Sequence, residues 1–322
     1  MSAHDRTVLV AGGAGFLGSH ICDHLIGRGD RVICIDNFST GTEKNINHLT
    51  DNDRFVCIDA DITQQGLDPT LTILGGRQRF TDVMHLASPA SPPEYLRRPI
   101  ETLEAGSIGT QNLLKLALRH NARFFLASTS EVYGDPLEHP QTESYWGNVN
   151  PIGERSVYDE AKRYAESITM AYHRRHGLEI RIARIFNTYG PRMQASDGRV
   201  VTNFIDQALR SAPITIYGDG TQTRSFAYCT DQTRGLIALL DNDTSGPVNI
   251  GNPTEFTVIE LANLVLDLTG SNSKIIHRAL PADDPKRRQP DITIAQRQLQ
   301  WEPTIPLREG LQSTINWLKR TP

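Results

Sequence analysis

The stretch VLVAGGAGFLGSH, residues 8–20, decides the fold class of this chain of 322 residues. It begins as a short apolar run, and glycines then recur at three-residue intervals as Gly12, Gly15 and Gly18. Glycines let the backbone turn tightly and approach a pyrophosphate, while the N-terminus of a following helix offers free N–H groups. The stretch therefore predicts a strand, a phosphate-binding turn and a helix.

The residues that follow repeat this alternation of strand and helix. Longer patterns predict helices near residues 15–28, 101–119 and 157–176. The short apolar runs predict strands over residues 7–11, 31–36, 55–62, 82–87, 123–129 and 179–185. Apolar strands separated by helices are typical of a parallel sheet that is covered on both faces. We expect an α/β fold with a Rossmann-type, doubly wound parallel sheet.

The alternation ends near residue 185, where turn-rich segments such as YGDGTQT begin. Helical patterns recur in this part of the chain near residues 199–210, 230–241, 257–269 and 307–319. We expect a dinucleotide-binding domain over residues 1–185 and a smaller mixed α/β lobe over residues 186–322, with some crossing of the chain between them.

Composition and charge exclude several classes of partner. The net charge is −4, and no apolar run reaches the roughly 18 residues that span a bilayer. We therefore expect neither a nucleic-acid nor a membrane partner. The four cysteines and ten histidines form no cluster with zinc-ligand spacing, and the first residues lack a signal pattern. We expect a cytoplasmic protein with reduced thiols and no metal.

Two aspartates at predicted strand ends favour NAD as the cofactor. Asp36 follows Gly18 by 18 residues, close to the spacing of a carboxylate that bonds both ribose hydroxyls. A carboxylate there repels a 2′-phosphate, which favours NAD over NADP. Asp61 ends the third strand, where it can bond the adenine amino group or serve only as a turn residue.

Tyr158 and Lys162 form a Y-x-x-x-K pair within the predicted helix over residues 157–176. Residues at i and i+4 share one face of a helix. A nearby ammonium lowers the pKa of a phenol, so we expect Tyr158 to act as a base near neutral pH. Lys162 can also hold the nicotinamide ribose.

Together with the segment FNTYGPR at residues 186–192, these elements resemble the extended short-chain dehydrogenase/reductase superfamily. The resemblance runs from Thr7 to Trp317 and implies a nucleoside-diphosphate sugar as substrate. It also implies that further residues contact NAD, namely Phe16, Leu17, Asn37, Ile62, Leu86 and Thr188.

The triplet Thr129-Ser130-Glu131 distinguishes members of this superfamily. The 4,6-dehydratases carry Thr-Asp-Glu there, and their aspartic acid protonates a departing hydroxyl at C6. Ser130 is a poor proton donor, so we do not expect loss of water. The C4-epimerases usually lack the glutamate, whereas this chain keeps Glu131.

A uronic acid substrate fits this combination. Oxidation of the C4 hydroxyl produces a ketone β to the C6 carboxylate, and a β-keto acid loses CO2 readily because the electrons enter the carbonyl as an enolate. No leaving group then needs a proton. Protonation at C5 and reduction at C4 complete the reaction and regenerate NAD.

Longer motifs, among them STSEVYGDP at residues 128–136 and DDPKRRQPDI at residues 283–292, resemble the UDP-glucuronate decarboxylases, also called UDP-xylose synthases. By that resemblance Tyr158 is the base at O4, helped by Lys162 and by Thr129 or Ser128. Ser130 and Glu131 lie near C5 and C6, and Arg288 reaches the substrate carboxylate.

The nucleotide sugar has its own candidate residues. Arginines suit a diphosphate because the guanidinium fork binds it bidentately. The expected contacts are Ser88, Asn187, Arg192, Tyr217, Arg224 and Arg288. The proline-rich segment over residues 88–99 is expected to form a stiffened loop over the site, or an ordinary surface loop.

One segment departs from the family pattern TLKTN and reads TLEAG, with Glu104 and Gly106 at the changed positions. A dTDP-linked uronate therefore remains open beside UDP-glucuronate. The resemblance also implies a homodimer. The alternatives are a C4-epimerase, a 4,6-dehydratase, an enzyme that makes a branched pentose as well, and a non-catalytic NAD-binding regulator.

Overall fold

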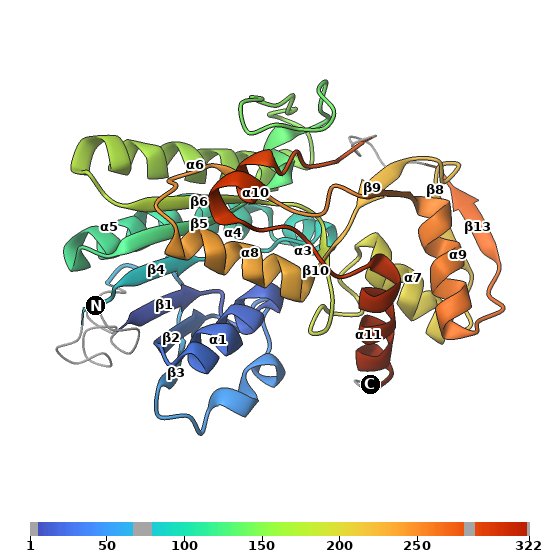
Figure 1. The fold of residues 1–322 in the computed structure, drawn as a ribbon, viewed down its shortest axis with the longest axis horizontal. Coiled ribbons are helices and arrows are strands. Elements are labelled where there is room, and N and C mark those ends of the chain that lie inside the picture. The colour runs from blue at the N-terminus through green and yellow to red at the C-terminus, as the bar shows by residue number, and fades with distance from the viewer. Residues whose placement is uncertain (1–5, 67–78, 280–286, 321–322) are drawn as a thin grey trace.

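The structure is a computed structural model that describes residues 6–66, 79–279 and 287–320. Figure 1 shows a larger group of elements around a central sheet and a smaller group of helices and short strands beside it. Residues 283–286 of the basic segment lie outside the described residues.

A parallel sheet of seven strands forms the centre of the larger group, in the order β11-β6-β5-β4-β1-β2-β3 (Figure 1). Its strands are β1 (Thr7–Ala11), β2 (Arg31–Asp36), β3 (Phe55–Asp59), β4 (Asp82–His85), β5 (Arg123–Thr129), β6 (Ile180–Ile185) and β11 (Val248–Ile250). The first six confirm the predicted strands, although β3 and β4 end earlier than expected. The strand order reverses beside β1, and at such a switch point the carboxyl ends of the strands leave a crevice for a ligand.

Helices cover both faces of this sheet. On one face lie α1 (Phe16–Arg28), α8 (Cys229–Asp241) and α10 (Thr293–Leu299), which share a hydrophobic core with β1 and β2. On the other face lie α4 (Pro99–Glu104), α5 (Thr110–His120) and α6 (Ser156–His176). The doubly wound α/β fold predicted from the sequence is confirmed.

The helix expected over residues 101–119 is interrupted by the π-helical turn η3 (Ala105–Gly109). Glycines allow close packing there: a Cβ at Gly106 would lie 2.7 Å from the Cβ of Ala161, and a Cβ at Gly109 would lie 2.5 Å from Ile62 Cδ1. The turn therefore brings α4 and α5 close to α6 and to the end of β3.

The smaller group packs around its own core of aliphatic and aromatic side chains. Its helices are α7 (Val200–Leu209), α9 (Val258–Thr269) and α11 (Leu307–Arg320). Its strands pair as β8 (Ile214–Tyr217) with β13 (Ile275–Arg278), β9 (Thr223–Ser225) with β12 (Glu255–Thr257), and β7 (Thr188–Tyr189) with β10 (Ala227–Tyr228). The chain returns to the large sheet through α8 and β11, so the two groups are linked more than once.

The remaining short elements are η1 (Glu43–Asn45), η2 (Asn47–Leu49), α3 (Pro92–Arg97) and η4 (Ser130–Tyr133). Among the described helices, none is both long and apolar enough to cross a membrane.

Candidate active site

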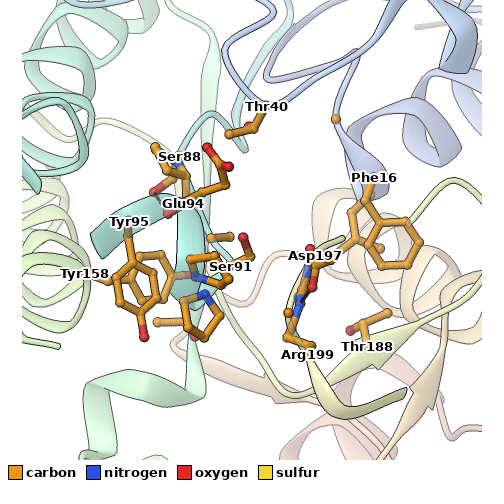
Figure 2. Close-up of a pocket in the computed structure, with 18 of the residues that line it drawn as sticks. Phe16, Thr40, Ser88, Ser91, Glu94, Tyr95, Tyr158, Thr188, Asp197 and Arg199 are labelled. Atoms are coloured by element: carbon orange, nitrogen blue, oxygen red, sulfur yellow. Dashed lines mark hydrogen bonds and ion pairs between the residues drawn. The ribbon is translucent and has the colours of Figure 1, made fainter. Parts of the chain in front are cut away.

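A cavity of about 830 Å³ opens at the carboxyl ends of the central strands and is also lined by the smaller group of elements. Figure 2 shows side chains from both groups facing one another across it. All residues that the sequence analysis assigns to the cofactor and the substrate line this one cavity. They are Gly12, Gly15, Phe16, Leu17, Gly18, Asp36, Asn37, Asp61, Ile62, Leu86, Ser88, Thr129, Ser130, Glu131, Tyr158, Lys162, Asn187, Thr188, Arg192, Tyr217, Arg224 and Arg288.

The glycine turn between β1 and α1 forms one end of the cavity. Gly12 has a φ of +81°, and a Cβ on it would lie 2.6 Å from the backbone nitrogen of Ala87. A Cβ on Gly18 would lie 2.0 Å from the carbonyl oxygen of Gly12. Only glycine fits these positions, so the backbone itself borders the space in front of the N-terminus of α1. This is the cradle that a dinucleotide pyrophosphate requires.

The carboxylate of Asp36 is fixed at the end of β2. Its Oδ2 accepts a hydrogen bond from Ala14 N at 3.0 Å, and its Oδ1 accepts one from Phe38 N at 2.9 Å. Each carboxylate oxygen has a second lone pair, which leaves both able to accept a ribose hydroxyl. These two acceptor oxygens therefore fit the hydroxyls of the adenosine ribose of NAD.

Asp61 lies beside Asp36 at the same edge of the sheet. Its Oδ2 accepts a hydrogen bond from Asn37 Nδ2 at 2.9 Å, and its Oδ1 accepts from the backbone and hydroxyl of Thr63. Partial burial opposes ionisation, but these hydrogen bonds lower the pKa of Asp61 below its usual value. Asp61 thus forms a turn and also lines the cavity, and its bond to the adenine amino group stays a prediction.

Tyr158 and Lys162 lie on the first turns of α6, with Lys162 Nζ 5.7 Å from the centre of the Tyr158 ring. Burial raises the pKa of Tyr158 to about 12, and a hydrogen bond with Thr129 offsets this only in part. Burial lowers the pKa of Lys162 to about 8. Burial therefore sets the pKa of the phenol in the protein's own groups, and the expectation that the Lys162 ammonium lowers it for catalysis stays a prediction.

The three hydroxyls at the end of β5 point to different partners. Ser128 Oγ donates to Glu166 Oε1 at 2.6 Å. Thr129 is the hydroxyl that reaches Tyr158. Ser130 is buried and lines the cavity where η4 begins. Of the two candidates to assist Tyr158, the geometry favours Thr129.

Glu131 is enclosed by two arginines. Its Oε1 accepts a hydrogen bond from Arg288 Nη1, and its Oε2 accepts one from Arg155 Nη2 at 2.8 Å. Burial opposes ionisation, but the charges of Arg288 and Arg155 lower the pKa of Glu131 to about 2. Glu131 is therefore a carboxylate, and Arg288 already has an anionic partner.

Asp159 lies behind this group on α6. Its side chain is buried, and its Oδ1 has no hydrogen-bond partner among the described residues. Burial and the neighbouring Glu131 carboxylate raise the pKa of Asp159 to about 7. A second buried carboxyl beside Glu131 therefore keeps its proton until the pH is near neutral.

The proline-rich segment is only partly a loop, which corrects the expectation for residues 88–99. Pro92 and Pro93 occupy the first two positions of α3, where a missing N–H is tolerated. The helix places Tyr95 against Tyr158, with ring centroids 5.2 Å apart and planes 7° from parallel (Figure 2). The segment thus contributes a wall behind the phenol of Tyr158.

The expected nucleotide-binding residues are engaged to different degrees. Arg192 Nη2 pairs with Asp23 Oδ2 of α1 at 2.6 Å, so its charge is shared with a carboxylate. The Tyr217 ring at the end of β8 is 43% exposed, which leaves a face open to a stacking partner. Arg224 lies on β9 and also lines the cavity.

Several residues of the cavity wall were not predicted. They are Ser91, Glu94, Tyr95, Arg155, Asp197 and Arg199. Arg155 lies one helical turn before Tyr158, a spacing that could have indicated it. Arg199 and Asp197 form an ion pair with each other, and no motif in the sequence marks them.

The two changed residues of the TLEAG segment lie in different surroundings. Glu104 adds a carboxylate to the cavity wall, while Gly106 is buried against Ala161 of α6. Within the described part of the chain, no group of three His, Cys, Asp or Glu side chains is placed to hold a metal ion.

Comparisons with known proteins agree on the family of folds. A family model described as GDP-mannose 4,6 dehydratase matches residues 9–314. UDP-glucuronic acid decarboxylase 1 of Arabidopsis thaliana is 55% identical over 309 residues, which cover 96% of this chain and 69% of the relative. UDP-glucuronic acid decarboxylase 1 of Xenopus tropicalis is 49% identical over 321 residues, which cover 99% and 74%.

Two solved structures show the same arrangement of elements. The UDP-glucuronic acid 4-epimerase of Bacillus cereus, in complex with UDP-glucuronic acid and NAD, has a TM-score of 0.86 at 29% identity. The UDP-glucose 4-epimerase of Thermotoga maritima has a TM-score of 0.88 at 29% identity. Each comparison covers 98% of this chain and 99% of the other.

Proposed function

The chain belongs to the GDP-mannose 4,6 dehydratase family and, within it, to the UDP-glucuronic acid decarboxylases, and we propose that it converts UDP-glucuronate to UDP-xylose and CO2 with bound NAD. One observation supports this proposal above all. Glu131 and Arg288 meet beside Tyr158 in the cavity, while Ser130 takes the position at which dehydratases carry their acid.

NAD would lie along the glycine turn, with its adenosine ribose on Asp36 and its adenine near Asp61 and Ile62. When bound, it supplies the hydride acceptor for the C4 carbon and returns the hydride at the end. The side chains of Phe16, Leu17, Asn37, Leu86 and Thr188 would complete its pocket.

Tyr158 would accept the proton of the C4 hydroxyl. Its phenol is protonated in the protein alone, because burial raises its pKa to about 12. A base of this kind must lose its proton as the substrate binds, and a charged Lys162 favours that loss. Lys162 also donates to the carbonyl oxygen of Ala127 at 2.9 Å, which fixes its ammonium beneath the site.

Arg288 would orient the C6 carboxylate of the uronate after C4 has become a ketone. The bond between C5 and C6 then breaks, its electrons enter the C4 carbonyl, and neutral CO2 leaves. A proton adds to C5 before C4 is reduced. Ser130 has no leaving hydroxyl to protonate in this sequence of steps, and Glu131 stays ionised next to C5.

The nucleotide would contact Tyr217 and Arg224 from the smaller group, with Ser88, Asn187 and Arg192 nearer the diphosphate. UDP is the nucleotide we propose, because relatives 49–55% identical to this chain are named for UDP-glucuronic acid. Because Glu104 replaces a lysine of the family pattern, the activity test below also includes dTDP-glucuronate as a substrate.

We also propose that the protein is a cytoplasmic homodimer. Its four cysteines are free, which suits a reducing compartment. Apolar side chains stand exposed on α4, η3 and α6, namely Ile100, Leu103, Ile108 and Tyr164. A second copy packed on these helices would cover them.

Product analysis by mass spectrometry tests the proposed activity. The protein with NAD is incubated separately with UDP-glucuronate, dTDP-glucuronate, UDP-glucose and dTDP-glucose, and Tyr158→Phe serves as the inactive control. We expect UDP-glucuronate to lose the mass of one CO2. Loss of water from a glucose substrate would indicate a dehydratase. An isomer of unchanged mass would indicate a C4-epimerase, and NAD binding without turnover would indicate a regulator.

A further inference from the structure

Two arginines from distant parts of the chain share the carboxylate of Glu131. Arg288 Nη1 binds one oxygen and Arg155 Nη2 binds the other, at 2.8 Å. All three side chains line the cavity. Glu131 therefore has one guanidinium for each of its oxygens.

The two arginines differ in how they are held. Arg288 is 3% exposed, its Nη2 donates to the carbonyl oxygen of Gly134 at 2.8 Å, and its Nε has no hydrogen-bond partner among the described residues. Arg155 precedes α6, and its carbonyl oxygen accepts from the N–H groups of Tyr158 and Asp159 at 3.1 and 3.2 Å. Arg155 is thus anchored to the helix that carries Tyr158, and Arg288 retains an unused donor.

The substrate carboxylate must compete with Glu131 for Arg288. When Arg288 takes up that carboxylate, Glu131 loses one cation and gains a second anion as its neighbour. A buried carboxylate in that position either protonates or moves, because burial without a partner is costly. Asp159, the neighbouring buried carboxyl, shows what such a group does here: burial and the Glu131 charge raise its pKa to about 7, so it keeps its proton to near-neutral pH.

We propose that Arg155 is a positioning residue that keeps Glu131 ionised and in place while Arg288 exchanges Glu131 for the carboxylate of UDP-glucuronate. The inference rests on the proposed function. The exchange also limits how tightly Arg288 holds the ground state, since Glu131 remains a competing anion. When neutral CO2 departs, Arg288 returns to Glu131 and no unpaired charge remains.

Arg155→Met tests the proposal, because methionine fills space without supplying a charge. We expect kcat to fall about 10–100-fold while KM changes less than about threefold, since a displaced Glu131 affects the reacting geometry more than binding. The acidic limb of the kcat profile should move to higher pH, because Glu131 without Arg155 takes up a proton at a higher pH. Arg155→Lys restores the charge and should recover part of the rate.

A double-mutant cycle separates this role from direct contact with the substrate. In a Glu131→Gln background, Arg155→Met should lower kcat no further, because no carboxylate remains to be held. Arg174→Met, at the exposed end of the same helix, is the matched control and should leave kcat unchanged. Single-turnover formation of UDP-xylose, quantified by mass spectrometry, measures each variant.

Either of two results would overturn the proposal: a normal kcat and pH profile in Arg155→Met, or an equally large loss of rate in the Glu131→Gln background. If Arg155→Met does not fold, Arg155→Gln, which also supplies no charge, takes its place, and a kcat and pH profile identical to those of the unmodified protein counts against us. Failure of the proposed function is a separate result, because the unmodified protein would then release no CO2 from UDP-glucuronate.

Discussion

Burial sets the charges of the residues around Tyr158. It raises the pKa of the phenol to about 12 and lowers that of Lys162 to about 8. At neutral pH the protein alone therefore presents a neutral tyrosine, an ammonium and the Glu131 carboxylate. We propose that proton removal from the C4 hydroxyl depends on a charged Lys162 ammonium.

The pH dependence of activity should follow Lys162. Its ammonium loses a proton as the pH rises through about 8, so kcat/KM for UDP-glucuronate should fall on the alkaline side of that value. The measurement is a pH profile at saturating NAD. A profile that stays flat up to the ordinary pKa of a lysine would contradict the assignment of a charged Lys162 to the reaction.

Site residues that are close together in the chain form local motifs that the sequence shows directly. Thr129-Ser130-Glu131 and Tyr158-Lys162 were predicted for this reason. The contact of Arg155 with Glu131 joins residues 24 positions apart and depends on how α6 packs on η4. The pKa of Tyr158 also required the structure, because burial cannot be read from a Y-x-x-x-K spacing.

Among the elements, α1 and its preceding turn have the most restrictive packing. The turn leaves no room for a side chain at Gly12 or Gly18, whereas Gly27 in the same helix has open space around its Cβ position. Two glycines of one helix therefore differ in what they tolerate.

Gly18→Ala and Gly27→Ala should change the protein in opposite directions. A methyl at Gly18 meets the Gly12 carbonyl oxygen, so we expect a loss of about 1–3 kcal/mol in the free energy of unfolding and at least a tenfold loss of NAD affinity. Gly27→Ala should gain about 0.4–1 kcal/mol with unchanged affinity. Urea unfolding and calorimetry with NAD measure both quantities, and equal behaviour of the two variants would contradict the proposed role of the turn.

Long apolar strands and amphipathic helices are the elements that sequence patterns predict well, as six of the seven strands of the central sheet illustrate. The strands of the smaller group have two to four residues, too few to show a period of two. The π-helical turn at Gly106 and helix α3 were not predicted. Packing against α6 determines the π-helical turn, and the two prolines that begin α3 made its sequence resemble a loop.

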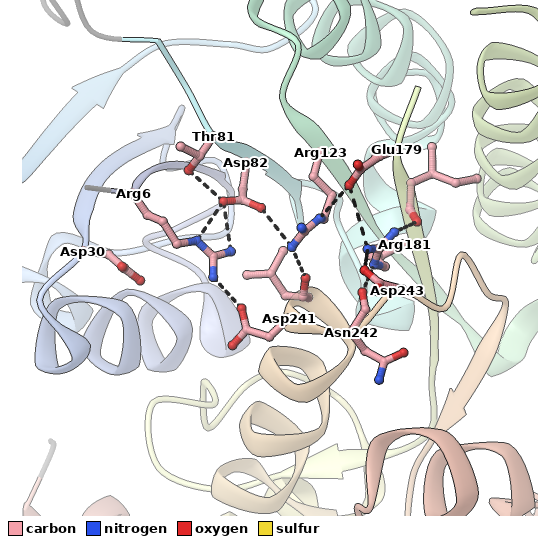
Figure 3. Close-up of polar contacts among 12 residues, drawn as sticks. Arg6, Asp30, Thr81, Asp82, Arg123, Glu179, Arg181, Asp241, Asn242 and Asp243 are labelled. Atoms are coloured by element: carbon pink, nitrogen blue, oxygen red, sulfur yellow. Dashed lines mark hydrogen bonds and ion pairs between the residues drawn. The ribbon is translucent and has the colours of Figure 1, made fainter. Parts of the chain in front are cut away.

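In the molecule as a whole, charged side chains form a network where the central strands begin, at the end of the sheet opposite the cavity. Figure 3 shows Arg6 and Arg123 converging on Asp82, while Arg6 also pairs with Asp241 and Arg123 with Glu179. Asp82 is buried and accepts hydrogen bonds from Arg6 and from the hydroxyl of Thr81. The network ties the starts of β1, β4 and β5 to the end of α8.

Removing Asp82 should weaken the fold without changing the chemistry. Asp82→Asn leaves two arginines with one anionic partner fewer, and we expect the free energy of unfolding to fall by about 1–3 kcal/mol with kcat unchanged. Asp243→Asn is the control, because this carboxylate is fully exposed and its loss should leave the free energy of unfolding nearly unchanged. Equal losses in the two variants would show that the network at Asp82 has no special weight.

The division of the chain at residue 185 stays a prediction, as does the homodimer. What the whole molecule adds is the joining of two distant segments: the strand end at Glu131 and the segment at Arg288 are 157 residues apart and meet in one cavity. No local pattern could have predicted that contact. The family resemblance placed both residues near C6 of the substrate and did not indicate that they bind each other.

Decarboxylation through a C4 ketone is tested most directly with UDP-glucuronate that carries deuterium at C4, in ordinary water and with unlabelled NAD. We predict a product lighter by one CO2 that keeps the deuterium at C4, because the hydride leaves and returns within one active site. In heavy water, unlabelled substrate should gain one deuterium at C5. Loss of CO2 with the C4 label washed out, or recovery of a C4 epimer with its carboxylate intact, would contradict the proposed reaction.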